Sequence, residues 1–411
     1  MQSAGTKKSR LHVSALAVAA LAALPLIAAR PAHARTETVL YSFTGGSDGG
    51  YPYAGLTPDG AGNFYGTATY GGLGNRDNGH GTVFELSPNG NGGWNETVLY
   101  TFTGLTDGGN PVGPVIFDSV GNLYGTAANG GATGSGVVFE LSPVGAKWTE
   151  TVLYSFAGGT DGDNPESGLL KDSAGNLYGT TLGCCGIAYG TVFELSPSRD
   201  GWTEQVIYSV ETTSLAGLTM DDAGNIFGIG NDSVFELSPN GEGGWTPTVI
   251  HTFTGPQTKD GWSAQGTPVF DSFGNLYGTT VYGGEKGQGT VYKLIPGKKG
   301  QWRERILHSF RGFPRDGGDP SGGVVLDADG NIYGTTVIGG KFGSRYGDGT
   351  IFELVAPLGN GRYKEKVLRN FDGRDGSDPM GNLFLDESGN LYGTTYSGGS
   401  SSAGVVFEVT P

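Results

Sequence analysis

One short apolar motif recurs seven times along the chain and constrains the fold more than any other feature. The motif is Val-Leu-Tyr-Ser-Phe or a close variant, and successive copies begin 43 to 61 residues apart. The copies start at Val39, Val98, Val152, Val206, Val249, Ile306 and Val367. Seven copies with periods above 40 residues predict a propeller or a solenoid rather than a string of independent domains.

Each period contains four strand signals, which we call a, b, c and d. In the third repeat, strand a falls at 167–170, strand b at 177–181, strand c at 190–197 and strand d at 202–210. Alternating β-branched and aromatic residues bounded by Gly, Pro and Asn are typical of strands. The sequence therefore predicts one four-stranded antiparallel sheet per repeat.

Strands a and b are joined by the motif Asp-x-x-Gly-Asn in every repeat. An Asp at the first position of a tight turn accepts hydrogen bonds from backbone N–H groups, and Gly at the fourth position accepts a left-handed conformation. We therefore expect a structural rather than a catalytic role for these aspartates, which are Asp59, Asp118, Asp172, Asp221, Asp271, Asp327 and Asp386.

The two ends of the repeat array complement each other. The array opens with a strand d at 37–43 and closes with a strand c at 405–409. Pairing the N-terminal strand with the C-terminal blade would complete seven blades and remove the open sheet edges. A solenoid would need polar caps at both ends. We therefore predict an all-β, seven-bladed β-propeller closed by its N-terminal strand.

Composition narrows the function classes. The 78 Gly and 20 Pro argue against a helical protein, whereas 45 aromatic residues provide a core that disordered chains lack. Only 16% of the residues are charged and the formal net charge is −15. This balance excludes a nucleic-acid binder that relies on a basic face.

Residues 1–34 have the pattern of an export signal. Lys7, Lys8 and Arg10 precede an apolar run from Val13 to Ala29, and Ala32-His33-Ala34 offers small residues at a signal-peptidase site. We expect cleavage after Ala34, which leaves 21 basic against 40 acidic residues and a net charge of −19. Residues 35–411 would then form a single propeller domain, secreted or periplasmic, with no membrane span.

The composite motif Asn-Leu-Tyr-Gly-Thr-Thr (176–181), then Gly-Thr-Val-Phe-Glu-Leu-Ser-Pro (190–197), resembles the Gloeo/Verruco (GloVer) tandem repeat over residues 36 to 411. This resemblance implies an exported bacterial protein of the kind called choice-of-anchor proteins, and it implies location and repeat identity rather than a chemistry. The chain stops at Pro411, directly after a strand c. We therefore expect free secretion or periplasmic residence, without a C-terminal anchor.

The d–a and b–c loops share one face of a propeller, and they vary most here, so that face is the expected binding surface. Six d–a loops carry Asp-Gly, and some add a second acid. Carboxylates and carbonyls suit Ca²⁺, although each Asp equally suits an Asx turn, and no other cofactor is expected. The candidate calcium ligands are Asp48, Asp107, Asp161, Asp163, Asp316, Asp319, Asp375 and Asp378.

Four further residues are candidate ligand contacts. Cys184 and Cys185 are the only cysteines and are adjacent. In an oxidising compartment they either form a strained vicinal disulfide, stay free thiols or pair between molecules. His80 stands alone in a b–c loop. Trp262, in a d–a loop, has no counterpart in the other repeats. Blade 4 has short loops, which predicts a notch between Cys184-Cys185 and Trp262.

Two classes of function remain open. The first is a non-catalytic exported binding or scaffold propeller, expected to be monomeric, that recognises a glycan, an envelope component or an extracellular protein. The second is a hydrolase or lyase of glycan or lactone type that uses carboxylates on the same face. The turn Asp-x-x-Gly-Asn-Leu-Tyr is similar to one in propeller lactonases and streptogramin lyases, but it is a structural turn. The sequence lacks zinc-protease and P-loop motifs, which favours the binder.

Overall fold

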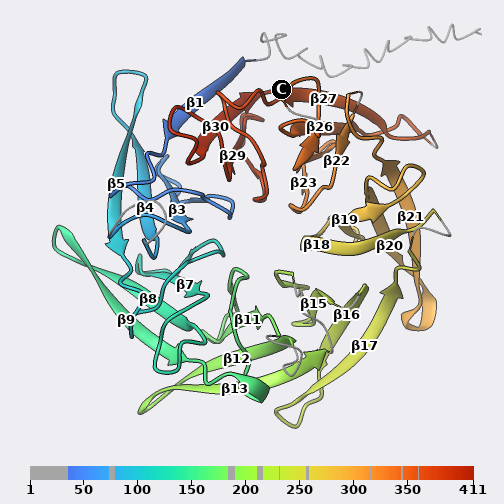
Figure 1. Ribbon diagram of the computed structural model, residues 1–411. Helices are drawn as coiled ribbons and strands as arrows, with labels where there is room; N and C mark the ends of the chain where they lie inside the picture. The colour runs from blue at the N-terminus through green and yellow to red at the C-terminus, as the bar shows by residue number, and fades with distance from the viewer. Residues whose placement is uncertain are drawn as a thin grey trace, which may run out of the picture. The chain divides into compact units, whose positions relative to one another are not determined.

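A computed structural model describes residues 36–73, 79–183, 190–210, 216–230, 232–255, 259–314, 316–343, 346–359 and 361–411. The unit from Arg35 to Pro411 is a ring of seven four-stranded antiparallel sheets, which confirms the predicted propeller (Figure 1). The helical elements of the described residues are two single-turn 3-10 helices, η1 (Gly159–Asp161) and η3 (Lys298–Gly300). None of the described helices is long and apolar enough to cross a membrane.

Within each blade the strands follow the predicted order, from strand a at the axis to strand d at the rim, and strand a has two residues in every blade except blade 5, where it has 10. Blades 1 to 3 consist of β2 (Thr57–Pro58), β3 (Phe64–Ala68), β4 (Thr82–Pro88) and β5 (Trp94–Thr101); β6 (Ile116–Phe117), β7 (Leu123–Ala127), β8 (Val137–Val144) and β9 (Lys147–Ser155); and β10 (Leu170–Lys171), β11 (Leu177–Thr181), β12 (Gly190–Ser198) and β13 (Gly201–Val210).

Blades 4 to 7 continue the same order, with one addition in blade 6, where β22 (Gly317–Gly318) and β25 (Ile338–Gly339) pair separately. The strands are β14 (Thr219–Met220), β15 (Ile226–Gly230), β16 (Ser233–Pro239) and β17 (Trp245–Thr252); β18 (Gly261–Phe270), β19 (Leu276–Gly283), β20 (Thr290–Pro296) and β21 (Trp302–Ser309); β23 (Val325–Leu326), β24 (Ile332–Thr336), β26 (Thr350–Val355) and β27 (Lys364–Asn370); and β28 (Phe384–Leu385), β29 (Leu391–Thr395), β30 (Val405–Thr410) and β1 (Thr36–Ser42).

The N-terminal strand completes blade 7. Strand β1 pairs antiparallel with β30 from Thr36 opposite Thr410 to Ser42 opposite Val405. The first and last strands of the ring therefore belong to one sheet, as the missing strands at the two ends of the repeat array indicate.

The recurring Val-Leu-Tyr motif forms a β-bulge. In blade 1, Val83 lies opposite Tyr100 but Phe84 lies opposite Val98, so Leu99 is an extra residue in strand d. The same shift occurs between strands c and d in all seven blades. A bulge bends its strand and increases the local twist, which suits the strongly twisted outer edge of a propeller blade.

The a–b turns have the predicted chemistry. Asp59 Oδ1 accepts hydrogen bonds from the backbone N–H groups of Ala61 and Asn63, at 2.7 and 3.1 Å, and its Oδ2 accepts one from Asn63 Nδ2 at 2.7 Å. Equivalent bonds form at the other six turns. The structural role expected for these aspartates is confirmed.

The core lies between blades. Each blade places a fully buried aromatic ring from strand c in this core, for example Phe84, Phe139 or Tyr292. The ring of Phe139 covers Gly125 of strand b, where an added Cβ would stand 2.5 Å from the ring. The blades pack against each other through these rings, and the inner ends of the d–a loops lie around the ring axis.

Candidate functional site

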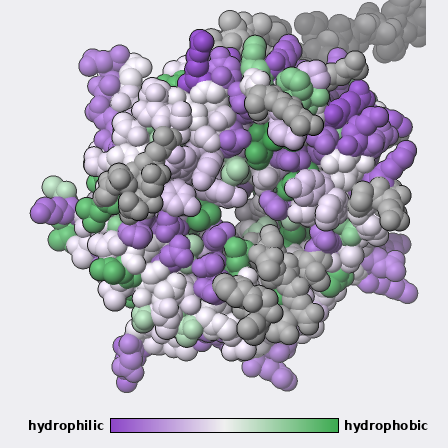
Figure 2. Space-filling model, viewed as in Figure 1, coloured by the Kyte–Doolittle hydropathy of each residue, from purple (hydrophilic) through white to green (hydrophobic). Residues whose placement is uncertain are grey.

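A cavity of about 410 Å³ lies on the axis of the ring, where the d–a loops enter strand a of every blade. Figure 2 shows a narrow opening at the centre of the molecule. Such a volume falls within the range of roughly 300–1,000 Å³ that is usual for ligand pockets. We call this space the axial cavity.

Small residues make up much of the wall of the axial cavity. Each blade contributes one at the same position of its repeat, namely Ala54, Gly113, Ser167, Ala216, Gly266, Gly322 and Gly381. A Cβ added to Gly113 would stand 2.5 Å from the carbonyl of Ser167 in the next blade, and one added to Gly266 would stand 2.4 Å from the backbone nitrogen of Gly323. Glycine is required because adjacent blades touch backbone to backbone here.

Threonines of strand b fasten this wall. The Thr126 hydroxyl donates to the carbonyl of Ser167 at 2.9 Å, and the Thr279 hydroxyl donates to that of Gly322 at 2.8 Å. Each bond joins one blade to the next. The repeated Leu-Tyr-Gly-Thr-Thr motif therefore holds the inner edge of the ring as well as its own sheet.

The residue that directly follows the Pro of the d–a loop gives the cavity its variable side chains. In five blades this residue is Tyr53, Val112, Glu166, Ser321 or Met380, and in blade 5 the corresponding residue is Gln265. Every one of these lines the cavity. This position varies between a repeated Pro and a small residue, so it is where ligand specificity would reside.

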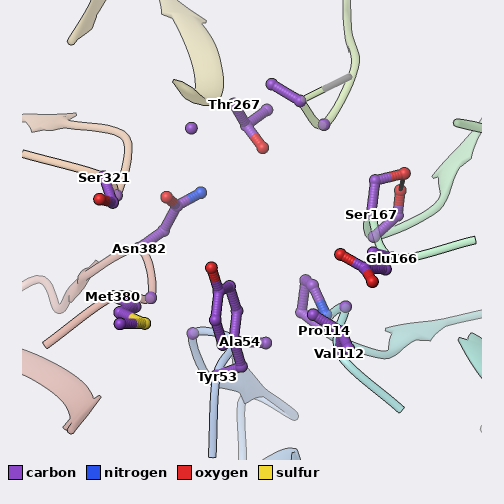
Figure 3. Close-up of a pocket in the computed structure, with 18 of the residues that line it drawn as sticks. Tyr53, Ala54, Val112, Pro114, Glu166, Ser167, Thr267, Ser321, Met380 and Asn382 are labelled. Atoms are coloured by element: carbon purple, nitrogen blue, oxygen red, sulfur yellow. Dashed lines mark hydrogen bonds between the residues drawn. The ribbon is translucent and has the colours of Figure 1, made fainter. Parts of the chain in front are cut away.

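Polar ends converge on the cavity from several blades. Figure 3 shows the Tyr53 hydroxyl, the Glu166 carboxyl, the Thr267 hydroxyl and the Asn382 amide directed toward its centre. The Asn382 side chain is oriented by its Oδ1, which accepts a hydrogen bond from the Gly323 N–H at 2.6 Å. Donors and acceptors thus face a common space.

Glu166 is the one carboxyl among the described lining residues. Burial raises the pKa of Glu166, and burial together with the Glu166 charge raises the pKa of Tyr53. A glycosidase needs two carboxyl groups about 5 to 9.5 Å apart. The described part of this cavity supplies one.

A tyrosine cluster extends from the cavity along the junction of blades 7 and 1. The ring of Tyr53 meets that of Tyr396 edge-on at 6.1 Å, and Tyr51 lies 5.1 Å from Tyr396 and 5.8 Å from Tyr70. Tyr53 and Tyr70 are 39% and 37% exposed, so aromatic faces remain open to a ligand at the rim. Such rings offer an apolar face together with a polar hydroxyl.

A second concavity, of about 690 Å³, lies on the outer side of blades 5 and 6. Its lining is strongly cationic, with Lys259, Arg305, Arg311 and Arg362 beside His308. It is remote from the converging loops at the axis, and only the side chains of blades 5 and 6 and the loop before blade 5 contribute to it.

The outer edge of the ring carries a repeated carboxyl cluster at the blade interfaces. At three of these interfaces a Tyr of strand d, the Asp of the following Asp-Gly loop and a Glu on strand d of the next blade come together. At three others His or Arg takes the place of the Tyr. We call these six groups the outer-edge clusters. Their members are Tyr41, Asp48 and Glu96; Tyr100, Asp107 and Glu150; Tyr154, Asp161 and Glu204; His251, Asp260 and Glu304; His308, Asp316 and Glu365; and Arg369, Asp375 and Glu37.

The Asp of each cluster accepts at least two hydrogen bonds. Asp107 Oδ2 accepts from the Tyr100 hydroxyl at 3.0 Å and from the Thr103 N–H at 2.8 Å, and its Oδ1 accepts from the Thr103 hydroxyl. Asp48 has equivalent partners. These bonds hold the pKa of Asp107 below its usual range despite burial.

The Glu of each cluster has a raised pKa. Burial, together with the charge of the neighbouring Asp, raises the pKa of Glu96 and Glu150 to about 7. One carboxyl oxygen of each is buried without a hydrogen-bond partner. The blade 3–4 interface departs from the pattern, because Pro247 replaces the Glu and the short loop carries no Asp-Gly.

Two of the four residues predicted as ligand contacts, His80 and Trp262, do not line the axial cavity. The ring of His80 packs against Gly104, and its carbonyl accepts a hydrogen bond from the Asn110 N–H at 2.6 Å. Trp262, expected in a loop, lies in strand β18 opposite Tyr282, with ring centroids 5.2 Å apart. Strand a is longer in blade 5 than in the others because its d–a segment pairs with β19. Cys184 and Cys185, and with them one wall of the predicted notch, fall outside the described residues.

The eight aspartates predicted as calcium ligands are distributed around the ring rather than gathered. Asp48, Asp107, Asp161, Asp316 and Asp375 belong to separate outer-edge clusters. Asp378 Oδ2 accepts a hydrogen bond from the Ser397 hydroxyl at 2.7 Å. Burial raises the pKa of Asp319. Asp163 pairs through its backbone with Leu182. Calcium binding therefore stays a prediction for titration to test.

Comparisons with known proteins agree with the architecture. The family model of the Gloeobacter/Verrucomicrobia repeat matches residues 30–232 and 216–411. A comparison with curated proteins found no match.

Solved structures are similar in fold. Virginiamycin B lyase from Staphylococcus aureus matches with a TM-score of 0.55 and 13% identity over 92% of this chain and 99% of that one. A protein from Lactobacillus plantarum matches with a TM-score of 0.51 and 13% identity over 80% and 95%. A gluconolactonase from Xanthomonas campestris gives a TM-score of 0.44 and 14% identity over 91% and 89%. At such identities the likeness concerns the propeller fold alone.

Proposed function

The chain belongs to the Gloeobacter/Verrucomicrobia repeat family, and on this framework we propose that it is an exported binding propeller that holds a neutral saccharide at the mouth of its axial cavity. The observation that carries the proposal is the convergence of Tyr53, Glu166, Thr267 and Asn382 on one space of about 410 Å³.

The chemistry of the lining suits a sugar. Saccharides present hydroxyl groups that both donate and accept hydrogen bonds, and the lining offers a carboxyl, an amide and hydroxyls to meet them. They also present apolar C–H faces, for which the exposed ring of Tyr53 offers a flat contact. Basic side chains are absent from the described lining, which disfavours a strongly anionic ligand.

The single carboxyl favours binding over hydrolysis. Glycoside cleavage by the usual mechanisms needs an acid and a second carboxylate, and the described lining supplies only Glu166. The pattern of the first 34 residues supports export, so the ligand would be an extracellular or envelope glycan. N-terminal sequencing of the exported protein, with Arg35 expected as the first residue, tests the export step.

The binding test is calorimetric titration of a panel of neutral oligosaccharides into the protein. We expect at least one to bind, and we expect Tyr53→Ala and Glu166→Gln each to weaken that binding by tenfold or more. Trp262→Ala is the matched control, because this aromatic side chain is exposed to a similar extent but does not line the cavity.

Two outcomes would overturn the proposal. Loss of binding in Trp262→Ala with retention in Tyr53→Ala would move the site to the Trp262–Tyr282 pair. Accumulation of shortened or unsaturated saccharides during the titration, detected by mass spectrometry, would replace the binding function with the hydrolase or lyase alternative.

A further inference from the structure

The outer-edge cluster between blades 4 and 5 differs from the other five. Within the described part of the chain, His251, Asp260 and Glu304 are the one group of three or more His, Cys, Asp or Glu residues whose ligand atoms all lie within 4.8 Å of one another. The group joins strand d of blade 4, the d–a loop and strand d of blade 5, so three separate segments converge on it.

Two atoms of this cluster are buried and lack hydrogen-bond partners. These are His251 Nε2 and Glu304 Oε1, which face each other at 3.7 Å. The two side chains are only 17% and 18% exposed. That separation is too long for a hydrogen bond, but it leaves room for an ion between the two atoms.

The cluster between blades 5 and 6 provides an internal comparison. It has the same residue types, but there His308 Nε2 lies 3.1 Å from Asp316 Oδ2 and makes a hydrogen bond. In the Tyr-containing clusters, the Tyr hydroxyl makes the equivalent bond to Asp. His251 therefore differs from the residues at the same position in these clusters, because its Nε2 atom makes no hydrogen bond to the Asp.

We propose that His251, Asp260 and Glu304 bind one divalent transition-metal ion of the Zn²⁺ class. One imidazole nitrogen and two carboxylates are a donor set that Zn²⁺ accepts, and three protein ligands leave a fourth position for water. The histidine argues against Ca²⁺, which takes oxygen ligands. The ion would tie the outer strands of blades 4 and 5 together, next to the interface where Pro247 and the short loop replace the usual Glu and Asp.

The test is calorimetric titration of Zn²⁺ into the untagged protein after EDTA treatment, with Ca²⁺ as the comparison ion. We expect one Zn²⁺ per chain, a rise in melting temperature with Zn²⁺, and no such response to Ca²⁺. Co²⁺ should give visible absorption bands of a low-coordinate site.

Variants locate the site. His251→Tyr introduces the residue that four other strands d carry at this position, so the fold is expected to persist while Zn²⁺ affinity falls at least 100-fold. Glu304→Gln should weaken binding to a similar extent. His308→Tyr and Glu365→Gln are the matched controls in the neighbouring cluster and should leave Zn²⁺ binding unchanged.

The proposal is wrong if the wild-type protein does not bind Zn²⁺. It is also wrong if His251→Tyr folds and binds Zn²⁺ as tightly as the wild type, a result that would direct attention to Cys184 and Cys185. Because none of these three ligands lines the axial cavity, either result leaves the proposed saccharide site untouched.

Discussion

Neighbouring blades contact each other differently at the inner and the outer edge of the ring. At the inner edge, blades meet backbone to backbone, with Gly113 beside Ser167 and Gly266 beside Gly323. At the outer edge they meet through buried carboxyl clusters such as Tyr100, Asp107 and Glu150. The inner edge has little room for side chains, so the few it admits can define a ligand site. The outer edge depends on side-chain chemistry and is therefore sensitive to pH.

The largest effect is expected at the inner edge. Gly113→Val would place a Cβ 2.5 Å from the Ser167 carbonyl, where backbone rather than a flexible side chain must move. We expect a loss of about 3 kcal/mol or more in the free energy of unfolding, measured by chemical denaturation. Val112→Ala, one residue away with its side chain in the cavity, is the control and should cost far less. Equal losses would show that the inner edge is not tightly packed.

At the outer edge, removing the hydrogen-bonded Asp should have the next largest effect. Asp107→Ala leaves the Tyr100 hydroxyl and the Thr103 N–H without their acceptor. We expect a loss of about 2 kcal/mol in the free energy of unfolding, against about 1 kcal/mol for Tyr100→Phe, which removes a single bond. A negligible loss in Asp107→Ala would contradict the assignment of these aspartates to structure.

The outer edge should also make stability depend on pH in an unusual direction. Burial raises the pKa of Glu37, Glu96, Glu150, Glu204 and Glu365 from 4.5 to about 7. The folded protein then binds protons more tightly than the unfolded chain. Stability that these groups contribute below pH 4.5 is lost as pH rises through about 7.

Melting temperatures measured at pH 5 and pH 8 test this expectation, and the value at pH 5 should be the higher. A double variant, Glu96→Gln with Glu150→Gln, should flatten the dependence because two of the titrating groups are removed. A melting temperature that rises steadily from pH 5 to pH 8 would contradict the burial of these carboxyls.

The smallest effect on stability is expected for Glu166→Gln, in the axial cavity. Its carboxyl is desolvated and its charge is not part of an outer-edge cluster, so the melting temperature should change by no more than about 2 °C. Saccharide binding should nevertheless fall. A variant that unfolds would show that Glu166 supports the ring instead of serving a ligand.

The sequence predicted the architecture because each strand and turn is encoded locally. The Asp-x-x-Gly-Asn turns and the strand order followed from residue types, and seven copies reinforced one another. The β-bulge at Leu99 was missed, since a single extra residue in a pairing leaves no separate mark in an apolar motif.

The candidate site was harder to predict. The axial cavity depends on how seven loops converge, and only the variation among Tyr53, Val112, Glu166, Ser321 and Met380 after a repeated Pro marked it in the sequence. The outer-edge clusters join residues from neighbouring repeats, so no single repeat contains one. Trp262 stood out because it had no counterpart, but it pairs with Tyr282 and does not line the axial cavity.

The saccharide site can be located in a crystal structure of the protein with a bound neutral oligosaccharide. We expect a sugar ring in the axial cavity, stacked on Tyr53 and within hydrogen-bond distance of Glu166 or Asn382. A saccharide bound only at the Trp262–Tyr282 pair, or at the rim away from the axis, would contradict this expectation.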